Sequence, residues 1–558
     1  MNAERLLAHY HEIADASDAI ARLRRFILDL AVRGKIVPQD PKEVPALQLL
    51  KQIAKEKTEL VKAGKIRKFD GPEAVVLDEQ PFNIPQTWQW VRLGDIVTKL
   101  TDGTHHSPPN ETTGDFKYIT AKNIKNEGVL LDDVTYVSRK VHDEIFARCD
   151  PAKGDILYIK DGATTGVVTI NDLDEQFSML SSVALLKLPV CIFNRLVVEF
   201  LRSPFFYDQM RGFMKGAAIT RVTLKRMGPA LVPLPPLAEQ YRIVAKVDEL
   251  MALCDRLAAA RGNRETVRDR LAASTLARLN APAPKTFQAD ARFALEALPT
   301  FTARPDQIKQ LRQTILNLAV RGELVPQDPA DEPASELAHG APELEGRLNA
   351  EIPRSWRWVK VEEVAEARLG KMLDKAKNKG RPYAYLRNTN VHWFDIRLDD
   401  LKNIPLDDAE FEEYRLKNGD VLICEGGHGI GRTAVWRGAF ENLVFQKALH
   451  RVRPGPHLDP SYFAQCCFVY FDAGIMQTYF TGVGIPHFTG RALAKLVFPL
   501  PPLAEQQRIV AKVDALMALC DRLEASLTAT TATRRRLLDA LLAEALAPAE
   551  DRELEAAE

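Results

Sequence analysis

Residues 234–257 read LPPLAEQYRIVAKVDELMALCDRL, and residues 500–523 read LPPLAEQQRIVAKVDALMALCDRL. The second copy differs from the first only where Tyr241 and Glu249 are replaced by glutamine and alanine. Chance does not retain 22 of 24 residues, so this internal repeat indicates two half-molecules in tandem. In each copy, two prolines followed by a first-turn glutamate predict the start of a helix, because both suit a helix N-terminus.

Two other pairs of segments extend the repeat. Ile20–Pro41 (IARLRRFILDLAVRGKIVPQDP) matches Ile308–Pro329 (IKQLRQTILNLAVRGELVPQDP), at an offset of 288 residues. Ile84–Val91 (IPQTWQWV) matches Ile352–Val359 (IPRSWRWV), at an offset of 268. The fall in the offset places about 20 extra residues in the first half, near Lys51–Asp70.

Between the matched segments the two halves diverge, over residues 92–230 and 360–497. Each half therefore consists of a constant segment, a variable globular domain and a second constant segment. Duplicated constant parts indicate two identical partners bound symmetrically, whereas the variable parts indicate two different targets. The alternative is a recent duplication in which one half drifts, but drift would not spare one segment and erase the next.

Apolar residues recur at heptad spacing after each LPPLAEQ stretch, which predicts a coiled-coil seam. We expect helices over about 238–280 and 504–545, each about 60 Å long, to pair antiparallel as a spacer. The seam of each helix would then meet the far end of the other, near Leu271, Leu537 and Leu541. The expected helix-pairing residues are Val247, Leu250, Cys254 and Leu257 in the first helix and Val513, Leu516, Cys520 and Leu523 in the second. The alternative is an ordinary amphipathic helix packed on its own domain.

The variable segments mix apolar strand-like runs with helical stretches. Strands are predicted at Asp155–Ile159 and Val421–Cys424, and helices near residues 193–215 and 460–480. Shorter amphipathic helices are expected in the constant segments over 20–31 and 308–319, each ending before a glycine. The predicted fold class is α/β (α+β): two globular domains in a pseudo-twofold tandem repeat, separated by a pair of long antiparallel coiled-coil helices.

Composition narrows the class of protein. The chain has 558 residues, with 75 Lys and Arg against 75 Asp and Glu, so contact with nucleic acid would depend on local basic patches. Its seven cysteines are scattered, which fits reduced thiols in the cytoplasm and neither a disulfide framework nor a zinc site. No apolar run reaches the length of a membrane span, and the first residues lack the apolar run of a secretion signal.

Several motifs resemble catalytic ones, but each lacks a residue or a loop that the chemistry requires. Gly426–Thr433 (GGHGIGRT) is close to a phosphate-binding loop, but arginine replaces the essential lysine. Phe480–Gly484 (FTGVG) matches a methyltransferase signature, but the acidic–aromatic loop that holds a flipped base has no counterpart. Adjacent histidines at 105 and 106 favour a solvent-facing or ligand-facing loop over a metal site. No catalytic, cofactor-binding or metal-binding residue is therefore predicted.

The strongest signal for nucleic acid lies in the second variable domain. Arg368–Arg387 (RLGKMLDKAKNKGRPYAYLR) holds seven basic residues against one acidic residue, with tyrosines interleaved. Lysine and arginine neutralise phosphates, while arginine and asparagine read guanine and adenine edges; the alternative is a solvated lysine-rich loop. The predicted DNA-binding residues are His105, His106, Lys122, Asn123, Lys125, Lys160 and Arg221 in the first domain and Lys371, Lys375, Lys377, Arg381, Arg387, Asn388, Asn390, Arg432 and His487 in the second.

Along nearly its whole length the chain resembles the specificity subunits of type I restriction–modification systems. The marks are the three repeated segments together with DGTHHSP at Asp102–Pro108 and GDILYIKDG at Gly154–Gly162. The resemblance implies that each variable domain is a target recognition domain for half of a split, asymmetric DNA site. It also implies that the constant helices set the gap and dock two methyltransferase subunits, which act together with restriction (translocase) subunits. S-adenosylmethionine, ATP and magnesium would belong to those partners, because the family has no catalytic residues of its own.

The expected domain boundaries follow from the repeat. They are an N-terminal constant segment (1–50), a basic insert and linker (51–83), target recognition domain 1 (84–233), a central constant helix (234–280), a linker (281–307), a second constant segment (308–351), target recognition domain 2 (352–499), a C-terminal constant helix (500–548) and an acidic tail (549–558). Two rivals remain open: a coiled-coil scaffold without DNA binding, and a fused methyltransferase or nuclease. The insert at Lys51–Asp70 is either a helix lying on DNA or a solvated linker. The bases recognised, the gap length, the choice between these roles of the insert, and whether the assembled system cleaves or only methylates do not follow from the residues.

Overall fold

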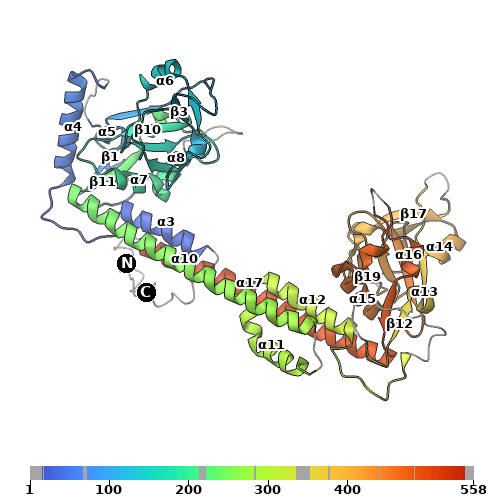
Figure 1. Ribbon diagram of the computed structural model, residues 1–558. Helices are drawn as coiled ribbons and strands as arrows, with labels where there is room; N and C mark the ends of the chain where they lie inside the picture. The colour runs from blue at the N-terminus through green and yellow to red at the C-terminus, as the bar shows by residue number, and fades with distance from the viewer. Residues whose placement is uncertain are drawn as a thin grey trace. The chain divides into compact units, whose positions relative to one another are not determined.

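The computed structural model describes residues 15–16, 18–66, 72–212, 221–281, 285–334, 352–374, 378–438, 440–482, 484 and 486–546. The chain divides into two compact units, Met1–Asn263 with Ala532–Glu558 (unit 1) and Arg264–Thr531 (unit 2). Two long helices, α10 (Leu237–Asn280) and α17 (Leu503–Leu546), contribute a part of their length to each unit (Figure 1).

The first globular domain, in unit 1, mixes short strands and helices. Its elements are η1 (Leu77–Glu79), β1 (Gln89–Arg92), α5 (Leu93–Ile96), β2 (Lys99–Asp102), β3 (Phe116–Ile119), η2 (Ala121–Asn123), β4 (Ile124–Lys125), β5 (Gly128–Val129), β6 (Thr135–Val137), α6 (Arg139–Phe146), β7 (Ile156–Ile159), β8 (Val168–Ile170), β9 (Phe177–Met179), β10 (Val183–Lys187), α7 (Asn194–Arg202), α8 (Pro204–Gly212), α9 (Leu224–Met227) and β11 (Leu231–Leu234). An antiparallel sheet has the order β2-β10-β7-β8, and a second sheet has the order β6-β3-β9, in which β3 and β9 are parallel. Strand β1 pairs with β11, so the two ends of the domain meet.

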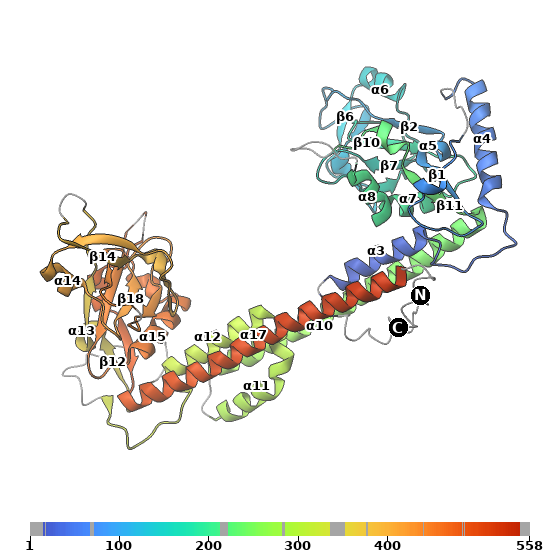
Figure 2. The same cartoon turned by 180° about the vertical axis from the view of Figure 1, so that it is seen from behind.

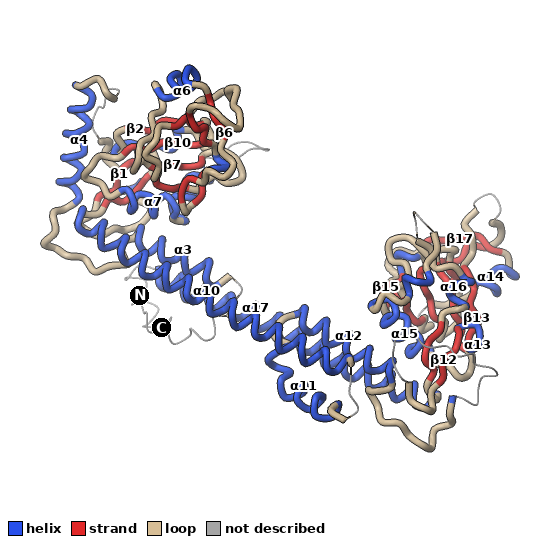
Figure 3. The backbone as a smooth tube through the Cα atoms, viewed as in Figure 1, coloured by secondary structure: helices blue, strands red, loops and turns tan. Residues whose placement is uncertain are grey.

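The second globular domain, in unit 2, repeats this topology. Its elements are β12 (Arg357–Lys360), α13 (Val361–Val364), β13 (Ala365–Leu369), β14 (Arg381–Leu386), η4 (Asn388–Asn390), β15 (Val391–His392), β16 (Asp395–Ile396), β17 (Lys402–Leu406), α14 (Asp408–Tyr414), β18 (Val421–Cys424), β19 (Thr433–Val435), β20 (Val444–Phe445), β21 (Leu449–Pro454), α15 (Pro460–Asp472), η5 (Met476–Tyr479), α16 (Gly490–Ala494) and β22 (Val497–Leu500). The sheets have the orders β13-β21-β18-β19 and β17-β14-β20, with β12 paired to β22. Figure 3 shows the strands gathered in the two globular domains, so the predicted α/β (α+β) tandem fold is confirmed.

The central strands explain why these divergent sequences share one fold. Strand β7 reads ILYI and β18 reads VLIC, and every residue of both is buried. Such continuous apolar runs are typical of strands covered on both faces. The pairing register is also the same, because Ile159 lies opposite Val183 in the first domain and Cys424 opposite Leu449 in the second.

Each unit carries the same joint between its globular domain and its constant helices. In unit 1, the Trp88 indole nitrogen donates to Glu239 Oε2 (2.8 Å) and Gln39 Nε2 donates to Glu239 Oε1 (2.6 Å). In unit 2, the corresponding bonds from Trp356 and Gln327 to Glu505 are 3.0 and 2.6 Å. The tryptophan and the glutamate are buried in both copies, so the identical residues of the repeat form a hydrogen-bonded joint at the start of each long helix.

A glycine ends the short constant helix in both halves. Helix α3 (Ala19–Val32) is followed by Gly34, and α12 (Pro305–Arg321) by Gly322, with φ of +67° and +78°. A Cβ at either glycine would also approach a proline Cγ to 2.5 Å. Both the backbone conformation and the close packing therefore require glycine, which confirms the predicted helix stops.

Helix α3 packs between parts of the two long helices inside unit 1 (Figures 1 and 2). Against α10 it runs antiparallel, with Arg24 paired to Asp255 at 2.5 Å and Arg261 donating to Ala16 O at 2.7 Å. Helix α3 runs parallel to the end of α17. Near the start of α3, Arg22 pairs with Asp539, and just beyond the end of α3, Lys35 Nζ donates to Leu546 O (3.0 Å). The segments of α10 and α17 in this unit are therefore antiparallel, as predicted.

The direct seam between the long helices is the part of the prediction that is wrong. Val247, Leu250 and Cys254 pack against Ile27 and Leu28 of α3 instead of Leu537 and Leu541. Leu541 packs on other residues of α3. In unit 2, Val513, Leu516, Cys520 and Leu523 likewise pack in one core with Ile308, Ile315 and Leu316 of α12. The physical reason is that α3 and α12 have apolar residues on more than one side, so each fills the seam that the heptad pattern assigned to the other long helix.

The first-half insert, expected to be a helix on DNA or a solvated linker, and the segment between the halves, expected to be a linker, both contain helices. In the first-half insert, α4 (Ala46–Lys62) buries Leu49 and Ile53 in the core of the first domain, beside α5. The ammonium of its Lys57 donates to the Gly94 and Asp95 carbonyl oxygens at 2.9 and 3.1 Å. Between the halves, α11 (Phe287–Phe301) packs on the end of α10 in unit 2. Apolar positions among the polar residues, which composition alone does not reveal, give both helices a buried face.

Candidate nucleic-acid interface

Charged side chains gather where β2 and β7 of the first domain end. The Lys160 ammonium lies 3.3 Å from both the Asp102 and the Asp161 carboxylates. Asp102 also pairs with Arg148 and lies 3.3 Å from His105 Nε2. Asp102 and Lys160 have side chains only 3% and 4% exposed, so they form the buried base of the cluster, while Arg148 and His105 are about half exposed above them.

The predicted contact residues of the first domain fall into two groups. Lys160 is buried and doubly paired, so it supports the cluster and does not present a free ammonium to phosphate. Asn123 is also buried, because its Oδ1 accepts from Thr120 N (3.1 Å) and its Nδ2 donates to Leu130 O (3.2 Å). Exposed positions are held by His105, His106, Lys122, Lys125 and Arg221, with Lys122 paired to Asp133 at 2.9 Å.

The second domain shows the same division. Asn390 is buried and accepts from Arg387 N (2.9 Å), as Asn123 does in the first domain. Arg387 pairs with Asp400 at 2.5 Å, and Lys371 pairs with Glu410. The hydrogen bond to Glu410 raises the pKa of Lys371, so this side chain stays a cation. Lys375 and Lys377 lie outside the described residues.

Asn388, Arg432 and His487 come together around the loop that follows β18. Asn388 Nδ2 donates to Gly426 O (3.3 Å), and His487 Nδ1 lies 3.2 Å from Glu425 Oε1. The loop itself depends on Gly427, Gly429 and Gly431, all with positive φ. Arg381 lies at the exposed start of β14, paired across the strands with Leu406. None of these predicted DNA contacts is tested by the fold alone, so they stay predictions.

Sequence reasoning missed the acidic members of both clusters, Asp102, Asp161 and Glu425, and also Arg148. An acid beside basic residues is not itself a signal for DNA binding, which explains why Asp161 and Glu425 were overlooked. The available signal was the repeat, because Asp161 lies two residues after β7 and Glu425 lies one residue after the equivalent strand β18.

The thiols of Cys149 and Cys424 are both buried. Burial raises the pKa of the Cys149 and Cys424 thiols to about 12, so neither supplies a thiolate near neutral pH. Across the described ranges, no three His, Cys, Asp or Glu side chains come together as metal ligands would. None of the helices in those ranges has both the length and the apolar character that a membrane span requires.

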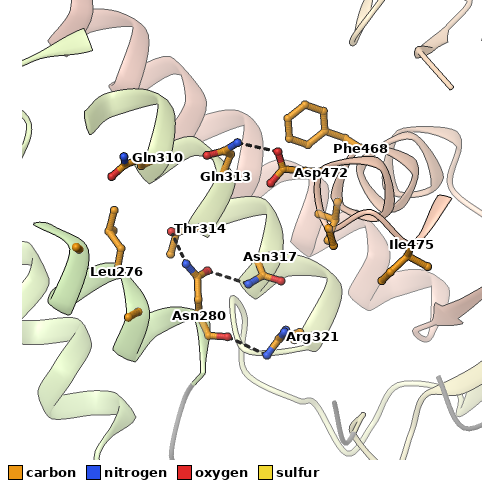
Figure 4. Close-up of a pocket in the computed structure, with 14 residues that line it drawn as sticks. Leu276, Asn280, Gln310, Gln313, Thr314, Asn317, Arg321, Phe468, Asp472 and Ile475 are labelled. Atoms are coloured by element: carbon orange, nitrogen blue, oxygen red, sulfur yellow. Dashed lines mark hydrogen bonds between the residues drawn. The ribbon is translucent and has the colours of Figure 1, made fainter. Parts of the chain in front are cut away.

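A cavity of about 500 Å³ in unit 2 lies among the end of α10, α12 and α15 (Figure 4). Asn280 connects the walls, since its Nδ2 donates to Thr314 Oγ1 (3.1 Å) and its Oδ1 accepts from Asn317 Nδ2 (2.8 Å). Arg321 donates to the Asn280 carbonyl at 2.8 Å, and Gln313 donates to Asp472 at 2.8 Å. These polar groups bond to one another, so the cavity is a structural joint between the helices and the globular domain.

Comparison with known proteins finds one family twice in the chain. The family model described as the type I restriction modification DNA specificity domain matches residues 85–264 and again 353–530. The chain is 29% identical to the type I restriction enzyme EcoAI specificity subunit of Escherichia coli over 94% of this chain and 93% of that one. It is 28% identical to the EcoEI specificity subunit of Escherichia coli, over 94% of each chain. Among solved structures, the HsdS subunit from Thermoanaerobacter tengcongensis is similar, with 21% identity, a TM-score of 0.44, and 84% of this chain and 98% of that chain covered.

The two matches cover more than half of the chain, and each spans one globular domain and the start of the long helix that follows it. The chain belongs to the type I restriction–modification DNA specificity family. Its function is sequence-specific DNA recognition in a type I restriction–modification system.

Proposed function

We propose that the chain reads a split and asymmetric DNA site, one half with each globular domain, and performs no catalysis itself. The observation that carries this proposal is the contrast between the two parts of each half. The joint around Glu239 is reproduced around Glu505 with the same residue types, whereas the loops at the ends of β7 and β18 carry different side chains. One scaffold presenting two different sets of loops suits two different half-sites.

The proposal includes two methyltransferase subunits as partners, docked on the duplicated constant surfaces. Unit 1 has a groove of about 720 Å³ and unit 2 one of about 480 Å³, each between the short and the long constant helix and the globular domain. The constant wall is the same in both, being made by Arg24, Leu28, Val247, Asp248 and Met251 in unit 1 and by Arg312, Leu316, Val513, Asp514 and Met517 in unit 2. Two identical walls suit two copies of one partner. Restriction subunits would join the same assembly.

S-adenosylmethionine, ATP and magnesium belong, in this proposal, to those partner subunits. The purified chain alone should transfer no radiolabelled methyl group to DNA and should not cut it. Activity would return when methyltransferase and restriction subunits are added. The working place of such an assembly is the cytoplasm, beside the DNA.

The test is selection of bound duplexes from a random pool by the chain assembled with methyltransferase subunits. The expected result is two short conserved blocks separated by unread base pairs. Exchanging residues 360–497 for the variable domain of another such subunit should then change one block and leave the other intact. If both blocks change together, the domains are not independent readers. If no sequence is selected, the rival of a coiled-coil scaffold without DNA binding is the better account.

A further inference from the structure

In equivalent loops of the two domains, one exposed side chain that can donate hydrogen bonds is paired with a carboxylate. In the first domain, Arg221 Nε lies 3.2 Å from Asp161 Oδ2. In the second, His487 Nδ1 lies 3.2 Å from Glu425 Oε1. The arginine and histidine side chains are 57% and 46% exposed, but their carboxylate partners are only 12% and 16% exposed. Each pair therefore has a fixed base and an accessible tip.

The backbone shows that the two pairs are structural counterparts. Asp161 and Arg221 form an isolated antiparallel bridge, and so do Gly426 and His487. The next residue along is also held alike, because Val222 N donates to Lys160 O (2.9 Å) and Phe488 N donates to Glu425 O (2.7 Å). Val222 and Phe488 are completely buried, so each anchors its exposed neighbour to the core. Arg221 and His487 thus occupy the same place on the scaffold.

The anchoring carboxylate, in contrast, moves by one residue between the domains. It follows Lys160 in the first domain, and it precedes Gly426 in the second. Glu425 therefore stands where the first domain has Lys160, directly after the buried central strand. The same backbone thus presents an arginine fork in one half and an imidazole ring in the other, which is a change in hydrogen-bonding chemistry without a change in position.

We propose that Arg221 and His487 each read one base pair of their own half-site, and that Asp161 and Glu425 are the positioning residues that fix their orientation. This inference rests on the proposed split-site function. The ion pair with Asp161 engages Nε of Arg221, so the Nη hydrogens remain for the O6 and N7 acceptors of a guanine. Contact of Nδ1 with Glu425 directs Nε2 of His487 to a base edge in the same way. A phosphate contact would need charge alone, whereas a base contact needs the orientation that a buried carboxylate provides.

The experiment is selection from a random duplex pool by the assembled complex, with D161N, R221Q, E425Q and H487Q compared with the unmodified chain. Either variant in the first domain should relax the preference at one base pair of one half-site by about 5- to 150-fold, because a bidentate base contact contributes about 1–3 kcal/mol of discrimination. The variants in the second domain should do so in the other half-site only. D161E should restore part of the preference, because it retains the carboxylate.

A matched control is D174N, which breaks the exposed pair between Asp174 and Lys153 (3.0 Å) in the first domain and should leave both blocks unchanged. Thermal unfolding of every variant separates loss of fold from loss of reading. Unchanged preferences in D161N and R221Q, or a uniform loss of affinity for all sequences, would overturn the inference while the split-site function stands. If the unmodified complex selects no sequence, the split-site function and this inference both fail.

Discussion

At the scale of single residues, the repeat allows each position in one half to be compared with its counterpart in the other half. Asn123 and Asn390 have the same chemistry as residues that read adenine, yet both stabilise a 3-10 turn through the same pair of hydrogen bonds. Arg221 and His487 differ in chemistry but occupy one place on the scaffold. Identity between the halves therefore marks structural roles, and difference at equivalent positions marks candidate readers.

A residue-scale prediction concerns Asp29 of α3, which corresponds to Asn317 of α12. Burial, with Asp208 nearby, raises the pKa of Asp29 to about 6, although Arg33 opposes the shift. A folded-state pKa above the unfolded value means that the stability contributed by the protonated carboxyl is lost as the pH rises from about 4 to 6. The D29N variant should remove this loss and raise the free energy of unfolding at pH 7 by about 1–3 kcal/mol.

Denaturant unfolding of D29N and the unmodified chain at pH 4 and pH 7 measures this effect. The two proteins should be nearly equal at pH 4 and diverge at pH 7, with D29N the more stable. A D29N variant that is less stable at pH 7 would show that the charged carboxylate stabilises the joint, against the prediction.

At the scale of elements, helix α4 shows how one insertion alters one half. Its Leu49 and Ile53 are part of the core of the first domain, and its Lys57 is buried against the carbonyl groups of α5. Burial lowers the pKa of Lys57 to about 8, which is the cost of bringing an ammonium to that place. The buried side of this basic segment is therefore structural.

The corresponding prediction separates stability from DNA contact. I53A should lower the free energy of unfolding by about 2–5 kcal/mol, because Ile53 is fully buried. K51A and K55A change exposed side chains on the same helix and should cost less than about 0.5 kcal/mol. Both lysine variants should keep the salt dependence of DNA binding by the assembled complex. A smaller slope of log Kd against log salt would instead place α4 on the DNA.

At the scale of the whole molecule, α10 and α17 each run from one unit into the other without a break. In the proposed assembly, a spacer made of these helices would set the gap in the DNA site by its length. Inserting one heptad in both helices should lengthen each by about 10 Å. The selected gap should then grow by about three base pairs, less what DNA bending absorbs. Selection of bound sites from a library of random gap lengths measures this, and recovery of the original gap would rule out the helices as the spacer.

The sequence alone determined the tandem repeat, the two variable domains, the two long helices and the family. These features could be predicted because a repeated segment and a heptad spacing lie in the order of the residues and do not depend on what each segment packs against. The buried strands 156–159 and 421–424 could also be predicted from the sequence, because a short continuous apolar run is typical of a strand covered on both faces.

Only the tertiary structure decided which surfaces meet. The heptad pattern predicts that Val247 and Cys254 pack against an apolar partner. Both α3 and the opposite long helix have apolar faces, so the pattern does not distinguish between them. In the structure these residues pack with α3. The orientation of the predicted contact residues was likewise decided by the fold. A lysine or an asparagine gives the same sequence signal whether its side chain faces DNA or bonds within the protein. Lys160 and Asn123 are buried because the fold packs other side chains around them. Hydrogen-bond partners far apart in the chain, such as Asp161 and Arg221, follow from the fold because no local spacing relates them.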